Sequence, residues 1–448
     1  MTTKQRDWIT AGALSLVALG FRLWHLGNVK GFIFDEVYYA KDAHSLLLHG
    51  VEMVNSTTAS YVVHPPVGKW LIALGIKIFG FHEFGWRVAA AVVGSLSVAV
   101  IFVTSKKLFD NYLLSSTAAL FMAFDGLELV QSRTALLDIF LMFFLQLSFL
   151  ALIYSQHWVA GVLLGLAAAT KWTGLYYMIA FGAFMIYADY RRRQTESRIA
   201  ESRFNYDAWS RDIGYRALQY VVIPVSIYIA SWSGWFLTKT GWDRDWANLR
   251  KSSFSFVPAV FRSWIHYQAQ VLDFHRHLTT PHPYSANPWG WLVMARPTAF
   301  LYQAPKNCGA PTCSQEILAL GTPVLWWSAA VAVLVTFGYW IARREWQSGL
   351  LLLAVGAGYL PWFLFQKRTM FTFYAIAFEP FLILVLIYSL SKLLESATSP
   401  RSLRVRQAGV VVLVLAVAVN FLYFLPLFIG TPIPYGVWHA HIWLPSWF

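Results

Sequence analysis

The first long apolar run of the sequence comprises residues 8–26, WITAGALSLVALGFRLWHL. It follows Lys4 and Arg6, it is long enough to cross a bilayer, and it lacks a small-residue cleavage site. We therefore predict a retained membrane helix and not a signal peptide. Because basic residues favour the cytoplasmic side of a membrane, the chain is expected to begin in the cytoplasm.

The composition extends this prediction to the whole chain. Of the 448 residues, 57% are hydrophobic and 13% are charged, whereas about a quarter of an average soluble chain is charged. A soluble enzyme is therefore excluded, and the apolar content suffices for about ten to twelve spans. The formal net charge of +13 is expected mainly to record membrane topology, and nothing else indicates a nucleic-acid partner.

Ten further apolar runs follow, so the sequence predicts an all-α polytopic membrane protein with about eleven transmembrane helices. These runs are 86–105, 113–130, 136–154, 158–170, 173–188, 217–237, 323–341, 348–366, 373–392 and 409–428. The weakest are 158–170 and 173–188, which are short and separated by Lys171 and Trp172 alone. An odd number of spans places the C-terminus outside, and basic segments such as 191–193 then fall in the cytoplasm, as the positive-inside rule requires.

Two long segments, 28–84 and 239–322, interrupt the apolar pattern and are rich in Trp, His, Pro and charge. They are predicted to be external loops that contain the chemistry. Residues 38–49 and 263–277 mix apolar and polar residues at near-helical spacing, which predicts amphipathic helices on the membrane surface. The chain thus divides into an N-terminal membrane region, a long external loop and a C-terminal membrane region, at 1–238, 239–322 and 323–448.

An acidic pair, Asp35 and Glu36, follows the first helix within the stretch FIFDEVYY, residues 32–39. Acidic residues are common at helix starts, so a cap or a solvated loop is one interpretation. Alternatively, desolvation among these aromatic residues raises a carboxyl pKa toward the range of a general base. The two carboxylates are also candidates to hold a divalent cation such as Mg²⁺ or Mn²⁺.

The stretch His64-Pro65-Pro66 cannot be helical, because the residue before a proline is pushed toward extended geometry. It is expected to hold His64 and Lys69 in a rigid turn at the membrane surface. The alternative is a purely structural turn with a snorkelling lysine.

Further charged residues fall mostly at the predicted external ends of the spans. They are Arg87, Asp125, Glu128, Arg133, Asp138, Lys171, Lys367, Arg368 and Glu379. A charge in hydrocarbon costs about 2.5–3.5 kcal/mol on some scales, so a cluster at one level predicts a shared polar site, although individual members can be interfacial residues or internal ion pairs. An acid, fixed cations and a water-excluded cleft suit group transfer from a lipid-linked phosphate, with a guanidinium to hold the phosphate.

The second loop adds three histidines and the only two cysteines of the chain. His275, His277 and His282 match no standard zinc spacing, so a substrate-facing or structural role competes with a metal site. Cys308 and Cys313 are predicted to form a disulfide if their loop faces an oxidising compartment, and to be free thiols otherwise.

Taken together, seven motifs resemble the protein O-mannosyltransferases of glycosyltransferase family 39, in particular the actinobacterial members. They are Phe34 to Lys41 (FDEVYYAK), His64-Pro-Pro-x-Gly-Lys69, Trp86-Arg87, Gln131-Ser-Arg-x-x-x-x-Asp138, Lys171-Trp-x-Gly-Leu175, Phe274 to Pro283 with Asn287 to Trp291, and Arg368-x-x-Phe371. The eukaryotic members insert a β-trefoil MIR region before the C-terminal spans. The loop 239–322 is too short for it, which favours a bacterial enzyme.

The resemblance implies a GT-C fold in the bacterial plasma membrane with an extracytoplasmic active site. It implies transfer of mannose from polyprenyl-phosphate mannose to Ser or Thr of secreted proteins, and it makes the protein translocation channel a candidate partner. Asp35 becomes the expected base, Glu36 a supporting or binding residue, and Arg87 the expected phosphate ligand. The other candidates for the substrate site are Tyr39, His64, Lys69, Arg133, Asp138, Lys171 and Arg368.

The working hypothesis is an inverting, single-displacement glycosyl transfer. Two alternatives remain open at this point. One is a transferase of the same fold that moves another lipid-linked sugar, such as arabinose, to a glycan or lipid. The other is a transporter of a lipid-linked substrate, although the charges gather at one face and not at mid-membrane, where secondary transporters bind.

Overall fold

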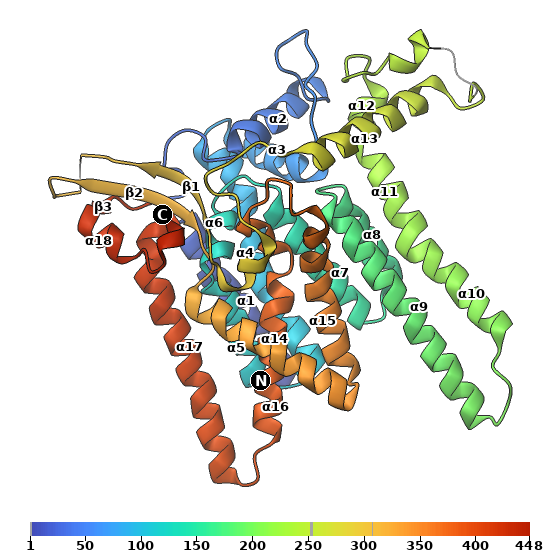
Figure 1. Cartoon of the computed structure of the whole chain (residues 1–448), viewed down its shortest axis with the longest axis vertical. Helices are drawn as coiled ribbons and strands as arrows, with labels where there is room; N and C mark the ends of the chain where they lie inside the picture. The colour runs from blue at the N-terminus through green and yellow to red at the C-terminus, as the bar shows by residue number, and fades with distance from the viewer. Residues whose placement is uncertain (1, 251–253, 307) are drawn as a thin grey trace.

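Long apolar helices run side by side through the molecule, and short helices with a small sheet lie at one end of them (Figure 1). This computed structural model describes residues 2–250, 254–306 and 308–448. The first helix starts at the lower end of the bundle in Figure 1, and the chain finishes near the upper end. We refer to these as the lower and upper ends.

Each predicted apolar run overlaps a helix or a helix pair. The elements are α1 (Thr3–Leu23), α4 (Glu83–Phe109), α5 (Tyr112–Ala123) with α6 (Gly126–Ser132), α7 (Asp138–Ile153), α8 (His157–Ala168), α9 (Thr173–Ile199), α10 (Tyr206–Ala217) continued by the π-helical turn η1 (Leu218–Val222) into α11 (Ile223–Ser231), α14 (Pro323–Arg343), α15 (Trp346–Tyr359), α16 (Glu379–Glu395) and α17 (Pro400–Ile429). Within the described ranges, five spans are long and apolar enough to cross a membrane, or six if the bent pair α5–α6 counts as one. The protein is therefore a multi-pass membrane protein, and the number eleven stays a prediction.

The break between α5 and α6 is explained by Asp125. One of its carboxylate oxygens accepts hydrogen bonds from the backbone N–H groups of Leu127 and Glu128 and so starts a new helix. The other accepts from the Thr322 backbone N–H and the Trp326 indole, at 3.0 and 2.8 Å. The two helices meet at 57°, and a polar layer forms where they part.

Short helices cover the upper end of the bundle (Figure 1). They are α2 (Glu36–His49), α3 (Val67–Phe79), α12 (Ser233–Leu237), η2 (Trp246–Leu249) and α13 (Ala259–His277). The two predicted amphipathic segments fall within α2 and α13. Helix α3 was not predicted, and it corrects the expectation for Lys69: the turn ends at Pro66, so Lys69 lies in a helix.

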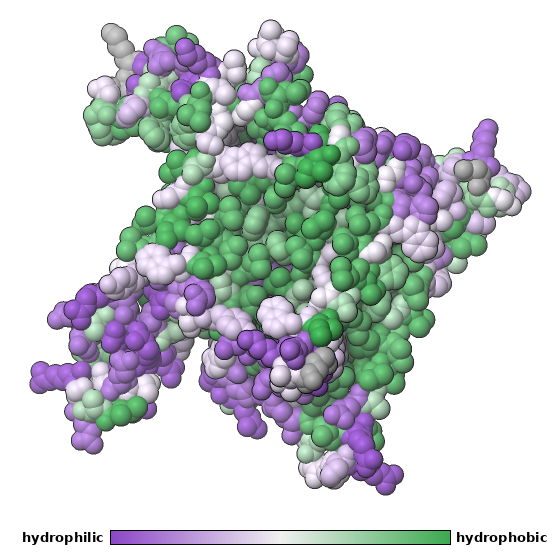
Figure 2. Space-filling model, turned by 180° about the vertical axis from the view of Figure 1, so that it is seen from behind, coloured by the Kyte–Doolittle hydropathy of each residue, from purple (hydrophilic) through white to green (hydrophobic). Residues whose placement is uncertain are grey.

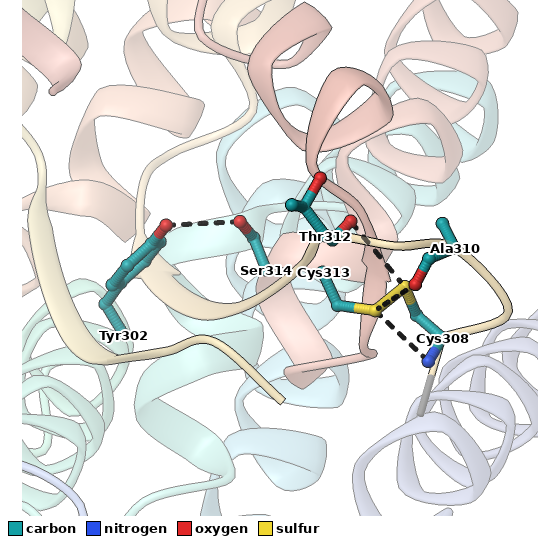
Figure 3. Close-up of a disulfide and its surroundings, with 6 residues drawn as sticks. All are labelled: Tyr302, Cys308, Ala310, Thr312, Cys313 and Ser314. Atoms are coloured by element: carbon teal, nitrogen blue, oxygen red, sulfur yellow. Dashed lines mark hydrogen bonds between the residues drawn. A yellow bond between two sulfur atoms is a disulfide. The ribbon is translucent and has the colours of Figure 1, made fainter. Parts of the chain in front are cut away.

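A small antiparallel sheet, which the all-α prediction did not include, extends from the upper end. Strand β2 (Cys313–Ala319) pairs with β1 (Thr298–Gln303) on one side and with the short β3 (Ile433–Pro434) on the other. A disulfide joins Cys308 to Cys313 next to the hairpin tip (Figure 3). The remaining short elements are η3 (Pro288–Val293), η4 (Leu360–Phe365), η5 (Thr372–Ala377), α18 (Tyr435–Ala440) and η6 (Pro445–Trp447).

One apolar core runs through the bundle, with α7 and α16 at its centre. Both helices are apolar on nearly every face and almost entirely buried, as expected for helices surrounded by other helices. Figure 2 shows a broad hydrophobic outer surface across the middle of the molecule and hydrophilic residues above and below it. This banding is what a bilayer requires of the helices that face it.

The crossing of α3 and α4 depends on glycine. A Cβ atom at Gly85 would collide with the carbonyl oxygen of Gly80, and one at Gly75 would collide with that of Gly85. We expect Gly85→Ala to lower stability by about 1–3 kcal/mol, because a well-packed contact cannot take the added carbon. The measurement is the temperature at which half the detergent-purified protein is lost from the monodisperse peak.

Gly12→Ala is the matched control, because no atom lies within 4 Å of the added Cβ there. Equal loss temperatures for the two variants would contradict the close α3–α4 contact.

Candidate active site

The loop that carries the acidic pair is held by aromatic contacts to distant parts of the chain. Phe34 has a φ of +51°, a left-handed conformation that is rare for a bulky residue and that the surroundings must enforce. Its ring stacks on Phe300 of β1 at 4.7 Å and meets the edges of Phe371 and Phe373. The next residue, Asp35, is thereby fixed at the start of α2.

Asp35 does not act as a helix cap, since its side chain makes no capping hydrogen bond. It lies outside the spanning helices, and burial raises the pKa of its carboxyl to about 6. The positive charge of Lys171 lowers that pKa and the negative charge of Asp138 raises it, but both effects are smaller than that of burial. A carboxyl that ionises near neutral pH beside a cation suits a general base.

The neighbouring carboxylate, Glu36, is in the opposite situation. It is fully buried, and Arg87, which is 1% exposed, donates to both of its oxygens at 2.8 Å. The backbone N–H groups of Ile33 and Ala135 donate to the same carboxylate at 2.9 Å. Glu36 thus ties its own loop to α4 and to the start of α7.

All the hydrogen-bond donors of Arg87 bind acceptors within the protein, whereas the sequence analysis predicted that Arg87 binds the donor phosphate. Its remaining N–H groups donate to the carbonyl oxygens of Leu26, Val29 and Gly31 at 2.8–3.2 Å, so each guanidinium N–H has an acceptor. No donor is left for a lipid phosphate. The geometry therefore assigns Arg87 to positioning the loop before Asp35.

The pair Asp35 and Glu36 does not fit a two-carboxylate cation site, because the Glu36 oxygens are occupied by protein donors. In the part of the chain that the structure describes, no group of three or more His, Cys, Asp or Glu side chains is arranged to hold a metal ion. Dependence on Mg²⁺ or Mn²⁺ stays a prediction.

Two more of the predicted cations also have structural partners. Lys69 is buried and forms ion pairs with Glu52 and Asp42. Arg133 donates through Nη1 to the carbonyl oxygens of Phe21, Arg22 and Trp24, at 2.7–3.0 Å, where α1 ends. Both side chains bind groups inside the fold, and neither lines the cavity that contains Lys171 and Arg368.

A cavity at the upper end contains the cations that remain. It is lined by His64, Lys171, Trp172, Thr173, Tyr176, Leu272, His275, Arg276, Trp362, Phe365 and Arg368. Lys171 donates to both oxygens of Asp138 at 2.8 and 3.0 Å, and its ammonium lies 4.2 Å from the centre of the Tyr374 ring. Asp138 thus holds Lys171 at the cavity wall. From there the positive charge of Lys171 also acts on Asp35.

A neutral histidine, His275, contacts the second cation, Arg368, and a second histidine, His64, lies beside His275 with 5.4 Å between the ring centres. Burial lowers the pKa of His275 to about 4 and that of His64 well below its usual value. His275 donates from Nε2 to the Val63 carbonyl, so its Nδ1 is free to accept from Arg368 at 3.4 Å. The Nε of Arg368 and the Nδ1 of His64 are buried without a partner among the described residues. Polar atoms of this kind indicate a place for a ligand.

The structure therefore gathers Asp35, Tyr39, His64, Asp138, Lys171 and Arg368, with the ring of Tyr39 5.9 Å from that of His64. It places Glu36 and Arg87 behind them. The sequence analysis named His275 as one of three histidines with a substrate-facing, structural or metal role but did not choose it for the site, although it lies in the motif Phe274 to Pro283. It also missed Tyr374 and Trp362, for which an aromatic-rich sequence offered no signal. The site draws on all three predicted regions, whose boundaries stay a prediction.

Comparison with solved structures defines the class of protein. The yeast protein O-mannosyltransferase Pmt1–Pmt2 complex bound to the sugar donor aligns with a TM-score of 0.81, covering 100% of this chain and 93% of that one at 14% identity. Cupriavidus metallidurans ArnT bound to undecaprenyl phosphate aligns with a TM-score of 0.53, covering 92% and 70% at 15% identity. At these identities the likeness shows the fold, which is that of the GT-C membrane glycosyltransferases.

Sequence relatives then identify the family. The polyprenol-phosphate-mannose–protein mannosyltransferase of Mycobacterium tuberculosis is 34% identical, over 99% of this chain and 92% of the relative, and that of Corynebacterium glutamicum is 32% identical, over 98% and 94%. Residues 63–202 match the family described as dolichyl-phosphate-mannose-protein mannosyltransferase, and residues 260–447 match the C-terminal four TMM region of protein-O-mannosyltransferase. The chain belongs to the protein O-mannosyltransferase family.

The structural role of Arg87 leads to a testable expectation. Arg87→Met removes one partner of a buried ion pair and leaves Glu36 charged and unpaired, which costs about 3–5 kcal/mol. We expect a clear fall in the temperature at which the purified protein is lost from solution.

The double variant Arg87→Met with Glu36→Gln should lose much less than the sum of the two single variants, because no buried charge is left unpaired. A fully stable Arg87→Met protein with a raised KM for the donor would contradict this structural role and support binding of the donor phosphate by Arg87.

Proposed function

We propose that this protein transfers mannose from polyprenyl-phosphate mannose to Ser or Thr hydroxyl groups of polypeptides. The observation that carries the proposal is Asp35, a half-buried residue whose carboxyl pKa is raised to about 6 and which lies within the electrostatic reach of Lys171, a residue that lines a cavity together with Arg368. The names of the relatives, which cover nearly the whole chain, supply the sugar, the lipid phosphate and the protein acceptor.

In the proposed reaction, Asp35 takes the proton of the acceptor hydroxyl. The hydroxyl oxygen forms a bond to the anomeric carbon as the bond from that carbon to the phosphate oxygen breaks. The polyprenyl phosphate leaves with the electron pair, and Lys171 and Arg368 stabilise its charge. A single displacement inverts the anomeric configuration.

Further parts of the proposal concern the location and the partners. The positive-inside charges favour a plasma-membrane protein with a cytoplasmic N-terminus. The upper end, with Asp35 and its cavity, then faces outward, together with the disulfide Cys308–Cys313. Membrane lipid surrounds the apolar band, the acceptors are secreted chains, and the translocation channel is a candidate neighbour that delivers them.

The two alternatives have less support. An arabinosyl transferase of Pseudomonas aeruginosa is 35% identical, but only over 37% of this chain and 31% of its own length. A transporter would need polar groups along a path through the membrane. Here the cavity that contains Lys171 and Arg368, with the unpartnered Nδ1 of His64 and Nε of Arg368, lies at one end of the bundle.

The pH dependence of mannose transfer tests the role of Asp35. A base must be ionised to accept a proton, so the raised pKa of Asp35 means that activity is present above about pH 6 and is lost as the pH falls through that value. Below it, kcat/KM should fall about tenfold per pH unit. The measurement is the initial rate of mannose transfer to a Thr-rich peptide, with and without a chelator.

Asp35→Asn is the matched variant, since it keeps the shape and removes the base. It should lower kcat by about 10²–10⁴-fold with the protein still folded. Wild-type transfer by folded Asp35→Asn would show that another group is the base.

The second prediction concerns the donor phosphate. Arg368→Ala removes a cation from the cavity wall, and we expect a loss of about 10- to 100-fold in kcat/KM for polyprenyl-phosphate mannose, because charge-assisted contacts of this kind contribute about 1.5–3 kcal/mol. Arg262→Ala, on the same surface helix as His275 but away from the cavity, is the control. Equal kinetics of the two variants would exclude Arg368 from the phosphate site.

A further inference from the structure

A second cleft lies at the lower end of the bundle, opposite the candidate active site. It has a volume of about 700 Å³ and is formed where the beginnings of α1 and α8 meet the final turns of α4 and α7. It is lined by Thr3, Lys4, Asp7, Trp8, Phe102, Val103, Lys106, Asp110, Leu147, Leu150, Ala151, Tyr154, Gln156, Val159 and Leu163. We call it the lower cleft. Nothing in the transfer reaction uses it.

The packing of the helices explains why the cleft forms. Helices α1 and α7 both pack against α4, and α8 packs against α7. Phe102 and Val103 on α4, with Leu147 and Leu150 on α7, give it apolar walls. An apolar cavity of this kind, open at a membrane surface, takes a hydrocarbon chain at the favourable free energy of burying CH₂ groups.

The mouth of the lower cleft is polar and carries an excess of positive charge. Lys106 lies 2.7 Å from Asp110 and 3.7 Å from Asp7, and Arg6 lies 3.3 Å from the same Asp7. Two cations there thus share two carboxylates, so the pairs balance. Two nearby lysines, Lys4 and Lys107, do not take part in these ion pairs.

Those two lysines give the mouth its net charge. Lys4 lines the cleft, and Lys107 lies next to the lining, 4.8 Å from the centre of the Tyr154 ring. Neither lysine has a carboxylate within ion-pair distance among the described residues. The mouth therefore carries two uncompensated positive charges, 4 cations less 2 acids. Trp8 and Tyr154 are exposed beside it, and such amphipathic rings favour the level of lipid headgroups.

We propose that the lower cleft binds an anionic glycerophospholipid of the adjacent leaflet. One acyl chain lies between α1 and α7 on the floor of α4, and the headgroup phosphate meets Lys4 and Lys107. A second copy of this chain would need an apolar and uncharged surface at the contact, whereas the mouth offers unpaired lysines. A neutral lipid would leave that charge uncompensated.

The test is lipid retention by the full-length protein, purified in mild detergent and offered equal amounts of phosphatidylglycerol and phosphatidylcholine. Native mass spectrometry then counts the bound lipids. Wild-type protein should retain phosphatidylglycerol preferentially. Lys4→Gln with Lys107→Gln should weaken that retention about 30-fold, since each lysine beside an anionic lipid contributes about fivefold.

Arg198→Gln with Arg203→Gln is the matched control, because it removes the same charge from residues near the end of α9, outside the cleft. The variant Leu150→Trp keeps the lysines and fills the lower cleft from its α7 wall, so it should also lose the lipid. Size-exclusion profiles confirm that each variant is folded.

Three results would overturn the proposal. The first is equal phosphatidylglycerol retention by wild type, the lysine variant and the filled variant. The second is equal retention of both lipids by wild type, which would show a non-selective apolar surface. The third is a dimer of the wild type that Leu150→Trp dissociates, which would show a second copy in the cleft. None of these depends on the proposed transfer reaction.

Discussion

The buried ion pair between Glu36 and Arg87 is the interaction on which the site depends. Two charges removed from water cost several kcal/mol each unless every donor and acceptor is used. Here the Glu36 carboxylate takes backbone donors from Ile33 and Ala135 as well as Arg87, and Arg87 takes three carbonyl oxygens from the loop after α1. This full set of bonds locks the loop, α4 and the start of α7 together directly behind Asp35.

Adjacent carboxylates thus acquire opposite roles from their surroundings. Glu36 is paired with a guanidinium and ties its loop to the fold, whereas Asp35 is half-buried near Lys171 and its pKa is raised to about 6. The stacking of Phe34 on Phe300 fixes the backbone just before the pair, where Phe34 adopts a left-handed conformation. Two guanidinium groups differ in a related way: every N–H of Arg87 has an acceptor inside the fold, whereas the Nε of Arg368, at the cavity, is buried without a partner among the described residues.

Much of the fold could be predicted from hydrophobic runs, because a spanning helix needs a long apolar segment whatever its neighbours are. Even the weak runs 158–170 and 173–188 correspond to α8 and α9. The sheet was not predicted. Its hairpin β1–β2 is a local pairing that the search for apolar runs did not consider, and the pairing of β2 with β3 joins Cys313 to Pro434, a contact between distant segments. Helix α3 was hidden inside a segment whose charge and prolines indicated a loop. In the site, the sequence named Asp35, Lys171 and Arg368, whose roles stay predictions. It assigned Arg87 to the phosphate, because sequence does not show how many acceptors surround a guanidinium.

The sequence by itself determined that this is a helical membrane protein and which family its motifs match. Those properties are local, since hydropathy, charge and motif spacing are written along the chain. Only the tertiary structure decided which charged side chains are used in ion pairs and hydrogen bonds inside the fold. Burial and hydrogen-bond partners come from residues far apart, such as Glu36 with Ala135 or His275 with Val63. For that reason the role of a carboxylate or guanidinium followed from its neighbours in space and not from its motif.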